Sequence, residues 1–247
     1  IMETNKRTSR LFSIAYSQLR EAKAAYDEWK SYISDGMDNA RYNEISRALL
    51  ENVFKNVSDS FESVPKKRHL FASAITPGGV KNYIDTLVTP NMKSYAIEGE
   101  PGIGVKEMIG RIALAAEQKG LYTEQFHCPF EPQYLDLLII PEISTAVLNM
   151  SKPFHYNVSK VDGLRIEDRI NLNICIKNNC VKEYQQEIED AKKRFYTLIA
   201  SAVEHLSRAK AAHDEMEKYY ISSMDFNKIE MRRKNLLERI LKTGSKI

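Results

Sequence analysis

The sequence contains few cysteines, and its three thiols limit the classes of protein to which it can belong. Cys128, Cys175 and Cys180 cannot all pair within one chain, so a small disulfide-stabilised scaffold is excluded. A metal site that combines His127 with Cys175 and Cys180 is disfavoured, because the CxxC pairs typical of zinc sites are absent. We therefore expect buried, unreactive thiols, no bound metal, and a protein of the reducing cytoplasm.

Long apolar runs are missing as well. No stretch of about 18 apolar residues is present, so we expect no transmembrane helix. The first residues, IMETNKRTSRLF, lack the continuous apolar segment of a signal peptide. Both absences predict a protein without a membrane-spanning element.

The chain also lacks a strong excess of either charge, because its 36 Lys and Arg residues nearly balance its 33 Asp and Glu residues, which gives a formal net charge of +3. The densest basic cluster, Lys66-Lys67-Arg68, is short and typical of a solvated linker. We do not expect nucleic acid to be a partner, because such proteins carry an extended basic patch. The 247 residues, 43% of them apolar, are enough for a sizeable core in one or two domains.

A repeat links the two ends of the chain. Residues 22–38 read AKAAYDEWKSYISDGMD, and residues 209–225 read AKAAHDEMEKYYISSMD. The same offset in numbering aligns Leu49-Leu50-Glu51 with Leu236-Leu237-Glu238, and no gap is needed in between. This constant register indicates a duplication, which is best recognised before any fold is assigned.

Each copy of the repeat has the pattern of a helical hairpin. Apolar residues between 188 and 219 recur at alternating spacings of three and four, as on the seam of a coiled coil. Residues 222–225, SSMD, offer side chains that cap a following helix, and the first copy turns at residues 34–36. We expect the two hairpins, 1–62 and 176–247, to superpose, with Tyr32 matching Tyr219 and Met37 matching Met224.

The segment between the hairpins, 63–175, has a different pattern. Strand-like segments cover 69–75, 94–99, 121–128, 135–140, 145–150 and 169–174, with a short helix after the turn at residues 77–79 and a longer helix at 105–120. Alternation of strands and helices predicts an α/β core with a parallel sheet of about five strands, covered on both faces. Ligands of such folds bind at the carboxyl ends of the strands.

A glycine-rich loop, AIEGEPGIGVKEMIG, follows the strand at 94–99. A phosphate-binding loop requires Gly, four residues, then Gly-Lys-Ser/Thr, so that backbone N–H groups surround an anion while the lysine neutralises phosphate and the hydroxyl holds Mg²⁺. Here Val105 replaces the lysine, Lys106 comes one residue late, and Glu107 follows. The residues of this candidate nucleotide or anion site are Gly99, Pro101, Gly102, Ile103, Gly104, Val105, Lys106 and Glu107.

An acidic metal ligand is also missing from the expected place. The strand TAVLN ends in Asn149, which is uncharged and binds Mg²⁺ poorly compared with a carboxylate. Asp136 precedes its strand and therefore lies at the wrong end of a parallel sheet. Two interpretations of the loop stay open, weak nucleotide binding or a glycine turn with a purely structural role.

Four stretches, RHLFASAITPGGVKNYIDTL, YAIEGEPGIG, FHCPFEPQYLDLLIIPEI and AKAAHDEMEKYYISSMDF, resemble an uncharacterised family of bacterial tandem P-loop ATPase-like proteins. The intact loop of that family is G-x-P-G-T-G-K-S-T, which this chain matches at Gly99, Pro101, Gly102 and Gly104. The family's acidic strand end, D-G-T-A-P-H, corresponds here to residues 149–154, with His155 displaced by one position.

The resemblance implies two P-loop units in tandem, each ending in a helical hairpin. By this interpretation, residues 1–62 end a preceding unit and residues 63–175 form a P-loop NTPase-like core. Residues 176–247 then repeat the first hairpin, so the chain is the C-terminal portion of a longer duplicated protein or has lost its front half.

Three functions remain open from the sequence. The first is a degenerate module that supports or regulates an active ATPase unit, either an N-terminal P-loop unit of the same protein or another protein. The second is an active ATPase that uses Lys106 in a shifted loop, and the third is an interaction scaffold made by the hairpins. ATP, another nucleotide, or a phosphate or sulfate anion are the expected ligands of the loop, whereas Mg²⁺ is poorly supported.

Overall fold

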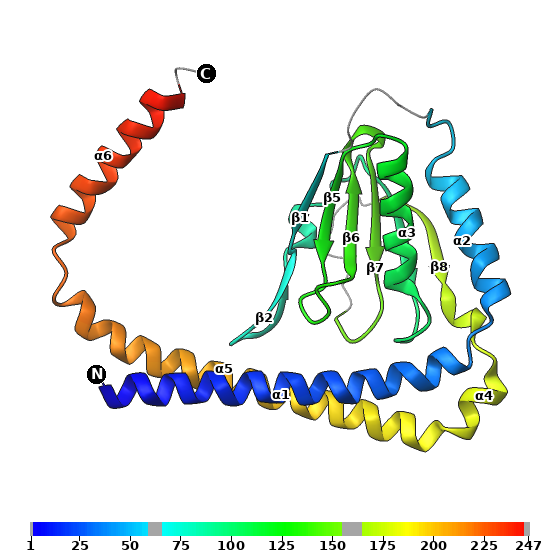
Figure 1. The fold of residues 1–247 in the computed structure, drawn as a ribbon, viewed down its shortest axis with the longest axis horizontal. Coiled ribbons are helices and arrows are strands. Elements are labelled where there is room, and N and C mark those ends of the chain that lie inside the picture. Colours follow the sequence, from blue (N-terminus) through cyan, green and yellow to red (C-terminus); the bar gives the residue numbers. More distant parts are fainter. Residues whose placement is uncertain (1, 59–65, 155–164, 245–247) are drawn as a thin grey trace.

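The structure is a computed structural model that describes residues 2–58, 66–154 and 165–244. Six strands form one sheet in the order β1, β5, β6, β7, β4, β8 (Figure 1). Their bounds in this spatial order are Lys67–Leu70 (β1), Thr123–His127 (β5), Leu135–Ile140 (β6), Thr145–Asn149 (β7), Lys93–Glu98 (β4) and Ile166–Asn171 (β8). The predicted α/β class is confirmed.

The direction of β6 corrects the expectation of a wholly parallel sheet. Strands β1, β5, β7, β4 and β8 run the same way, whereas β6 is antiparallel to both of its neighbours. Only residues 141–144 separate β6 from β7, including the 3₁₀ turn η2 (Pro141–Ile143). A parallel connection needs about a dozen residues, so this short link requires the chain to reverse.

The central strands of the sheet, β5, β6, β7 and β4, are buried on both faces, as predicted. One face packs against helix α3 (Val105–Gln118), whose inward stripe contains Met108, Ile109 and Ile112, each 0% exposed. The other face carries a second cluster that includes Phe126 and Leu137. Helical periodicity in α3 and apolar residues on both sides of the central strands therefore produce a layered core.

The segment covering that second face differs from the prediction. Residues 69–75 do not form one strand, because the chain leaves β1 at Leu70 and starts a hairpin of β2 (Ser73–Thr76) and β3 (Gly79–Asn82). The predicted turn is present, with Gly79 at φ +89°. The short helix predicted after it is reduced to a 3₁₀ turn, η1 (Ile84–Thr86).

Four longer helices carry the sequence repeat. They are α1 (Met2–Asp35) and α2 (Asn39–Val53) in the first copy, and α5 (Gln185–Ile221) and α6 (Phe226–Gly244) in the second. The copies correspond closely, since α2 and α6 begin at equivalent positions of the repeat and each is capped by an aspartate, Asp38 and Asp225. Between core and second copy lie η4 (Leu172–Cys175) and α4 (Asn178–Glu183).

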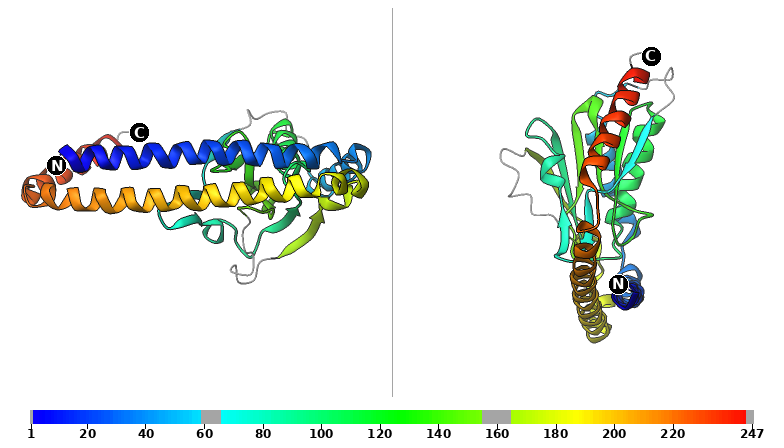
Figure 2. Two further views of the ribbon diagram at one scale, coloured as in Figure 1. Left: turned by 90° about the horizontal axis from the view of Figure 1, so that it is seen from below. Right: turned by 90° about the vertical axis from the view of Figure 1, so that its left-hand side faces the viewer.

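The prediction that each copy folds back as a hairpin is wrong. Helix α1 packs along α5 of the other copy, and α2 and α6 turn away from that pair (Figures 1 and 2). The α1–α5 pair is antiparallel and closely spaced, because Ala15, Ala22, Ala202 and Ala209 are all 0% exposed. Small residues allow two long helices to approach closely, so the apolar seam found in the sequence is a contact between the copies.

Candidate functional site

The glycine loop lies at the carboxyl end of β4 and leads into α3, as the sequence predicts. Gly104 caps α3 with φ +90°, and Gly102 has φ +98°. These left-handed conformations are costly for residues with a Cβ atom, so both positions favour glycine. A strand, a glycine-rich loop and a helix therefore follow one another at this edge of the sheet.

Helices α1 and α2 lie directly against this loop. A Cβ atom at Gly102 would come within 2.3 Å of the Lys30 carbonyl oxygen, and one at Gly104 within 2.9 Å of the Tyr42 ring. The Ser34 hydroxyl donates to the Gly102 carbonyl at 2.9 Å, and the Tyr42 hydroxyl donates to the Gly104 carbonyl at 2.9 Å. The glycines thus allow the first repeat copy to contact the loop backbone.

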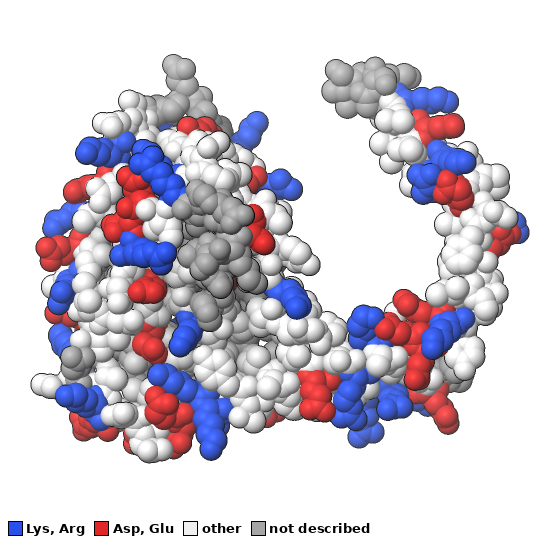
Figure 3. Space-filling view, turned by 180° about the vertical axis from the view of Figure 1, so that it is seen from behind, with Lys and Arg blue, Asp and Glu red and all other residues white. Residues whose placement is uncertain are grey.

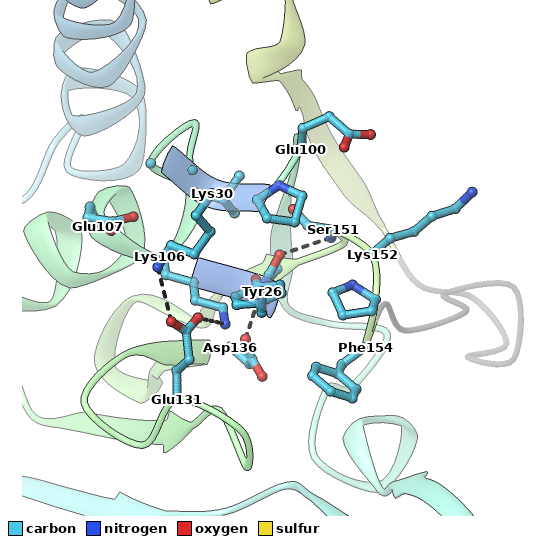
Figure 4. A pocket seen from close by; sticks show the side chains of 16 residues that line it. Tyr26, Lys30, Glu100, Lys106, Glu107, Glu131, Asp136, Ser151, Lys152 and Phe154 are labelled. Atoms are coloured by element: carbon cyan, nitrogen blue, oxygen red, sulfur yellow. Dashed lines mark hydrogen bonds and ion pairs between the residues drawn. The ribbon is translucent and has the colours of Figure 1, made fainter. Parts of the chain in front are cut away.

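Lys106 faces a carboxylate of the protein itself (Figure 4). Its Nζ lies 2.7 Å from Glu131 Oε2 and 3.2 Å from Cys128 Sγ. Lys30 of α1 donates to the other oxygen, Glu131 Oε1, at 3.0 Å. Lys23 of α1 lies 3.6 Å from the same oxygen. Because Glu131 is 1% exposed, it is a buried anion held between a lysine of the loop helix and two lysines of α1.

The electrostatics of this ion pair are strongly perturbed. Burial by itself lowers the pKa of Lys106, but the phenol of Tyr26, the thiol of Cys128 and the carboxylates of Asp136 and Glu131 raise it above its usual value. Burial by itself raises the pKa of Glu131, but its interactions with Lys106 and Lys30 lower that pKa by more, so the net shift is downward. Both groups are therefore charged at neutral pH.

Several N–H groups of the loop already have partners inside the protein. Gly99 N donates to Ser151 Oγ at 3.1 Å, and Glu100 N donates to Asn173 Oδ1 at 2.7 Å. Ile103 N donates to the Glu100 carbonyl at 3.2 Å. An anion at the loop would consequently have fewer backbone donors than the sequence pattern suggests.

Asn149 belongs to the wall of the same cavity as the glycine loop. Asp136, predicted to lie at the wrong end of its strand, lies beside it. Asn149 Nδ2 donates to Asp136 Oδ1 at 2.8 Å, and Asn149 Oδ1 accepts from Ser151 N at 2.9 Å. Asp136 is at the site because β6 is antiparallel, which brings the start of that strand next to the end of β7. One carboxylate thus lies beside Asn149, at the end of β7.

The cavity at these residues is small. It measures ≈ 30 Å³, which is space for only a few water molecules. Of the predicted residues, Gly99 and Ile103 are not part of its wall, and Ile103 is fully buried. The wall is formed by Tyr26, Lys30, Glu100, Pro101, Gly102, Gly104, Val105, Lys106, Glu107, Glu131, Asp136, Asn149, Ser151, Lys152, Pro153 and Phe154.

The most informative members of this wall were not found from the sequence. Tyr26 and Lys30 belong to α1, and Glu131 lies in the loop between β5 and β6. No motif connects these positions with Lys106, from which they are distant in the chain. The sequence contains only an indirect signal for Glu131. Lys106 lies next to the apolar stripe of α3, and a lysine that is buried there requires a counter-ion.

The cysteines behave as expected where the structure describes them. Cys128 and Cys175 are buried, and burial raises the pKa of Cys128 to about 11, so this thiol is protonated at neutral pH. The side chain of Cys180 lies outside the described residues. His127 is hydrogen-bonded to His69, with 2.8 Å between their ring nitrogens. Among the described side chains, the single cluster suited to a metal is on the exposed surface of α5, formed by His213, Asp214 and Glu217.

Comparisons with known proteins add no assignment. No protein-family model, curated protein or solved structure matches this chain. In the described part of the chain, none of the helices has both the length and the apolar character to cross a membrane. The arguments for function therefore depend on the site itself.

Proposed function

We propose that this chain is a degenerate P-loop-like unit with a structural or regulatory role beside an active ATPase unit, and with weak or no hydrolysis of its own. The single observation that carries this proposal is the pair of Lys106 and Glu131, with 2.7 Å between charged atoms. The lysine nearest to the phosphate position is neutralised by the protein. The phosphate of a nucleotide would have to displace a buried carboxylate.

The chemistry of phosphoryl transfer supports the same conclusion. Transfer depends on cations positioned around the phosphate, and this loop has Val105 in place of the lysine and no hydroxyl for Mg²⁺ at Lys106. Asn149 replaces the acid, and its amide is bonded to Asp136. Each such contact is typically worth about 10²- to 10³-fold in rate, so the loss of two or three leaves little activity.

Instead of binding phosphate, the loop holds the first repeat copy in place. Both Gly102 and Gly104 accept hydrogen bonds from that copy, and Lys30 reaches Glu131 from α1. The residual ligand proposed for the loop is a phosphate or sulfate anion, or a weakly bound nucleotide such as ATP, with Mg²⁺ poorly supported. The proposed partner is another P-loop unit, in the same protein or another one, and the proposed location is the cytoplasm.

A calorimetric titration with ATP, with and without Mg²⁺, tests the proposal. We expect no Mg²⁺-dependent binding to the unmodified chain. Glu131→Gln should free Lys106 and raise the affinity for ATP or inorganic phosphate at least tenfold, whereas the exposed Glu98→Gln should change nothing. Circular dichroism checks that each variant is folded at the temperature of the titration.

One observation favours a second candidate, an active ATPase with a shifted lysine. Lys106 and Asp136 line the same cavity, and the Asp136 carboxylate helps to raise the pKa of Lys106, so a cation and an acid are near each other. This candidate requires Glu131 to move when ATP enters. Mg²⁺-dependent ATPase activity of the unmodified chain, abolished by Lys106→Ala, would establish it and refute the structural proposal.

A further inference from the structure

The two copies of the repeat have the same pattern of apolar residues but very different surroundings. In α2, Tyr42 is 3% exposed and Leu49 is 2% exposed, because the helix covers the α/β core. Their repeat equivalents in α6 are Ile229 at 43% and Leu236 at 57%. The apolar stripe of α6 therefore has no core beneath it, and it differs from that of α2 at one buried position, where Arg233 stands in place of Ser46.

The exposed surface continues from α6 into the end of α5. Apolar side chains that are exposed on these two helices and the link between them include Tyr219, Tyr220, Ile221, Met224, Phe226, Ile229, Met231, Leu236, Leu237 and Ile240. A row of large exposed apolar side chains on one helix face, such as Ile229, Leu236 and Ile240, is typical of a surface that another protein covers. We call this set the α6 surface.

The arrangement of the helices defines where the covering body lies. Helices α1 and α5 are antiparallel, and both Gln18–Ser201 and Glu28–Arg194 join them. Helices α2 and α6 rise from opposite ends of that pair on the same side (Figure 1). The two copies are thus related by an approximate two-fold axis through the middle of the α1–α5 pair.

The position related to the α/β core by this axis is not occupied by any described part of the chain. The sheet and α3 lie between α2 and the axis (Figure 1), and the space between α6 and the axis is open (Figure 3). Rotation about the axis would carry the core into that space. There it would contact α6 as the present core contacts α2.

We infer that the α6 surface binds a second α/β core of the same architecture as 66–175, in the position related by this two-fold axis. The occupant is not a second copy of this chain in its present form, because the corresponding face of that copy's core is already covered by its own α2. The inference deepens the proposed function, on which it rests, by identifying the partner unit. It depends on different residues from those of the glycine loop.

Hydrogen–deuterium exchange on an extended chain tests this inference. In the extended chain, residues 63–187 are added before residue 1, and the junction resembles the natural one because Ile1 is the repeat equivalent of Ile188. Exchange of residues 226–240 should be fast in the unmodified chain and at least tenfold slower in the extended chain. Leu236→Asp should remove this protection, whereas Lys234→Asp, on the polar face of α6, should retain it.

Two results would overturn the inference. One is that residues 226–240 exchange equally fast in the unmodified and the extended chain, although slow exchange of the core peptides shows that both cores are folded. The other is protection of α6 in the unmodified chain together with a dimer in sedimentation, which would show that copies of this chain cover each other. Neither result involves nucleotide, so this failure is distinguishable from a failure of the proposed function.

A graft decides the question if the added core does not fold. In the graft, residues 226–240 replace residues 39–53 of the unmodified chain. Ser46 is kept in place of its repeat equivalent, Arg233, because that position is 3% exposed. If α6 fits this kind of core, the graft should unfold within about 5 °C of the parent, a shift of roughly 1–2 kcal/mol. The same graft carrying Leu236→Asp in the transferred segment should be unfolded. If the graft without this substitution is unfolded, the inference is wrong.

Discussion

The first repeat copy is part of the α/β core, whereas the second leaves it after the first half of α5. Trp29 of α1 is 2% exposed and lies in the main core, while its equivalent in α5, Met216, is only partly buried. Lys30 contacts the buried Glu131, while its equivalent, Glu217, is exposed beside His213. The comparison shows that duplicated helices with one pattern can differ in burial, because burial depends on what lies opposite.

Substitution of equivalent leucines should show the largest difference between the copies. Leu49→Asp places a charge in the contact of α2 with the core and should cost at least about 4 kcal/mol of unfolding free energy. Leu236→Asp should change it by less than about 0.5 kcal/mol, because that side chain is 57% exposed. Urea unfolding followed by circular dichroism measures both, and similar losses would show that α6 is packed in the isolated chain.

The ion pair beneath α1 should give the next largest effect. Glu131→Gln leaves Lys106 buried without its charge partner and should cost about 3–5 kcal/mol. Glu217→Gln, at the repeat equivalent of Lys30, should have almost no effect. Thermal unfolding compares the two variants, and a stable Glu131→Gln protein would mean that Lys106 finds another anion.

A side chain at Gly102 should separate the first copy from the core. Gly102→Ala combines a left-handed backbone with contact to the Lys30 carbonyl and should cost about 2–4 kcal/mol. Gly110→Ala is the matched control, because its Cβ would meet open space within α3. That change should stabilise the protein by about 0.5–1 kcal/mol, and equal melting temperatures for both variants would argue against close contact at Gly102.

Acid should weaken the contact between α1 and the core. The pKa of Glu131 is lower in the folded protein than in the unfolded chain, where it is about 4.3. The carboxylate therefore stabilises the fold at pH values above the unfolded-state pKa, and this stabilisation is lost as the pH falls through the folded-state pKa. The melting temperature should fall less between pH 6 and pH 3 in Glu131→Gln than in the unmodified chain. Parallel pH profiles would show that other carboxylates account for the acid sensitivity.

The helix caps should give the smallest difference. Asp38 accepts from the N–H groups of Ala40 and Arg41, and Asp38→Ala should cost about 1 kcal/mol of global stability. Asp225→Ala removes the equivalent cap, but it should only increase fraying of α6, seen as faster exchange near Lys228. A loss of global stability in Asp225→Ala would place α6 inside the cooperative unit.

Much of the fold could be predicted from local patterns. The glycine loop, α3 and the central strands β4, β6 and β7 lie where periodicity placed them, because they are short segments with strong apolar signals. The direction of β6 was missed, and with it the position of Asp136, because a strand has the same pattern in either direction. The prediction that each repeat copy folds back on itself failed for a similar reason. An apolar seam shows that a helix is covered, but it does not identify which other helix covers it.

The sequence by itself determined the α/β class, the repeat with its constant register, and the absence of a lysine and a hydroxyl from the usual places of the loop. These properties depend on residue identity and spacing along the chain. Only the tertiary structure decided that Glu131 neutralises Lys106, that α1 and α2 lie on the glycines, and that α6 is exposed. Those contacts join residues far apart in sequence, and their energies depend on distance and burial, which no local pattern encodes.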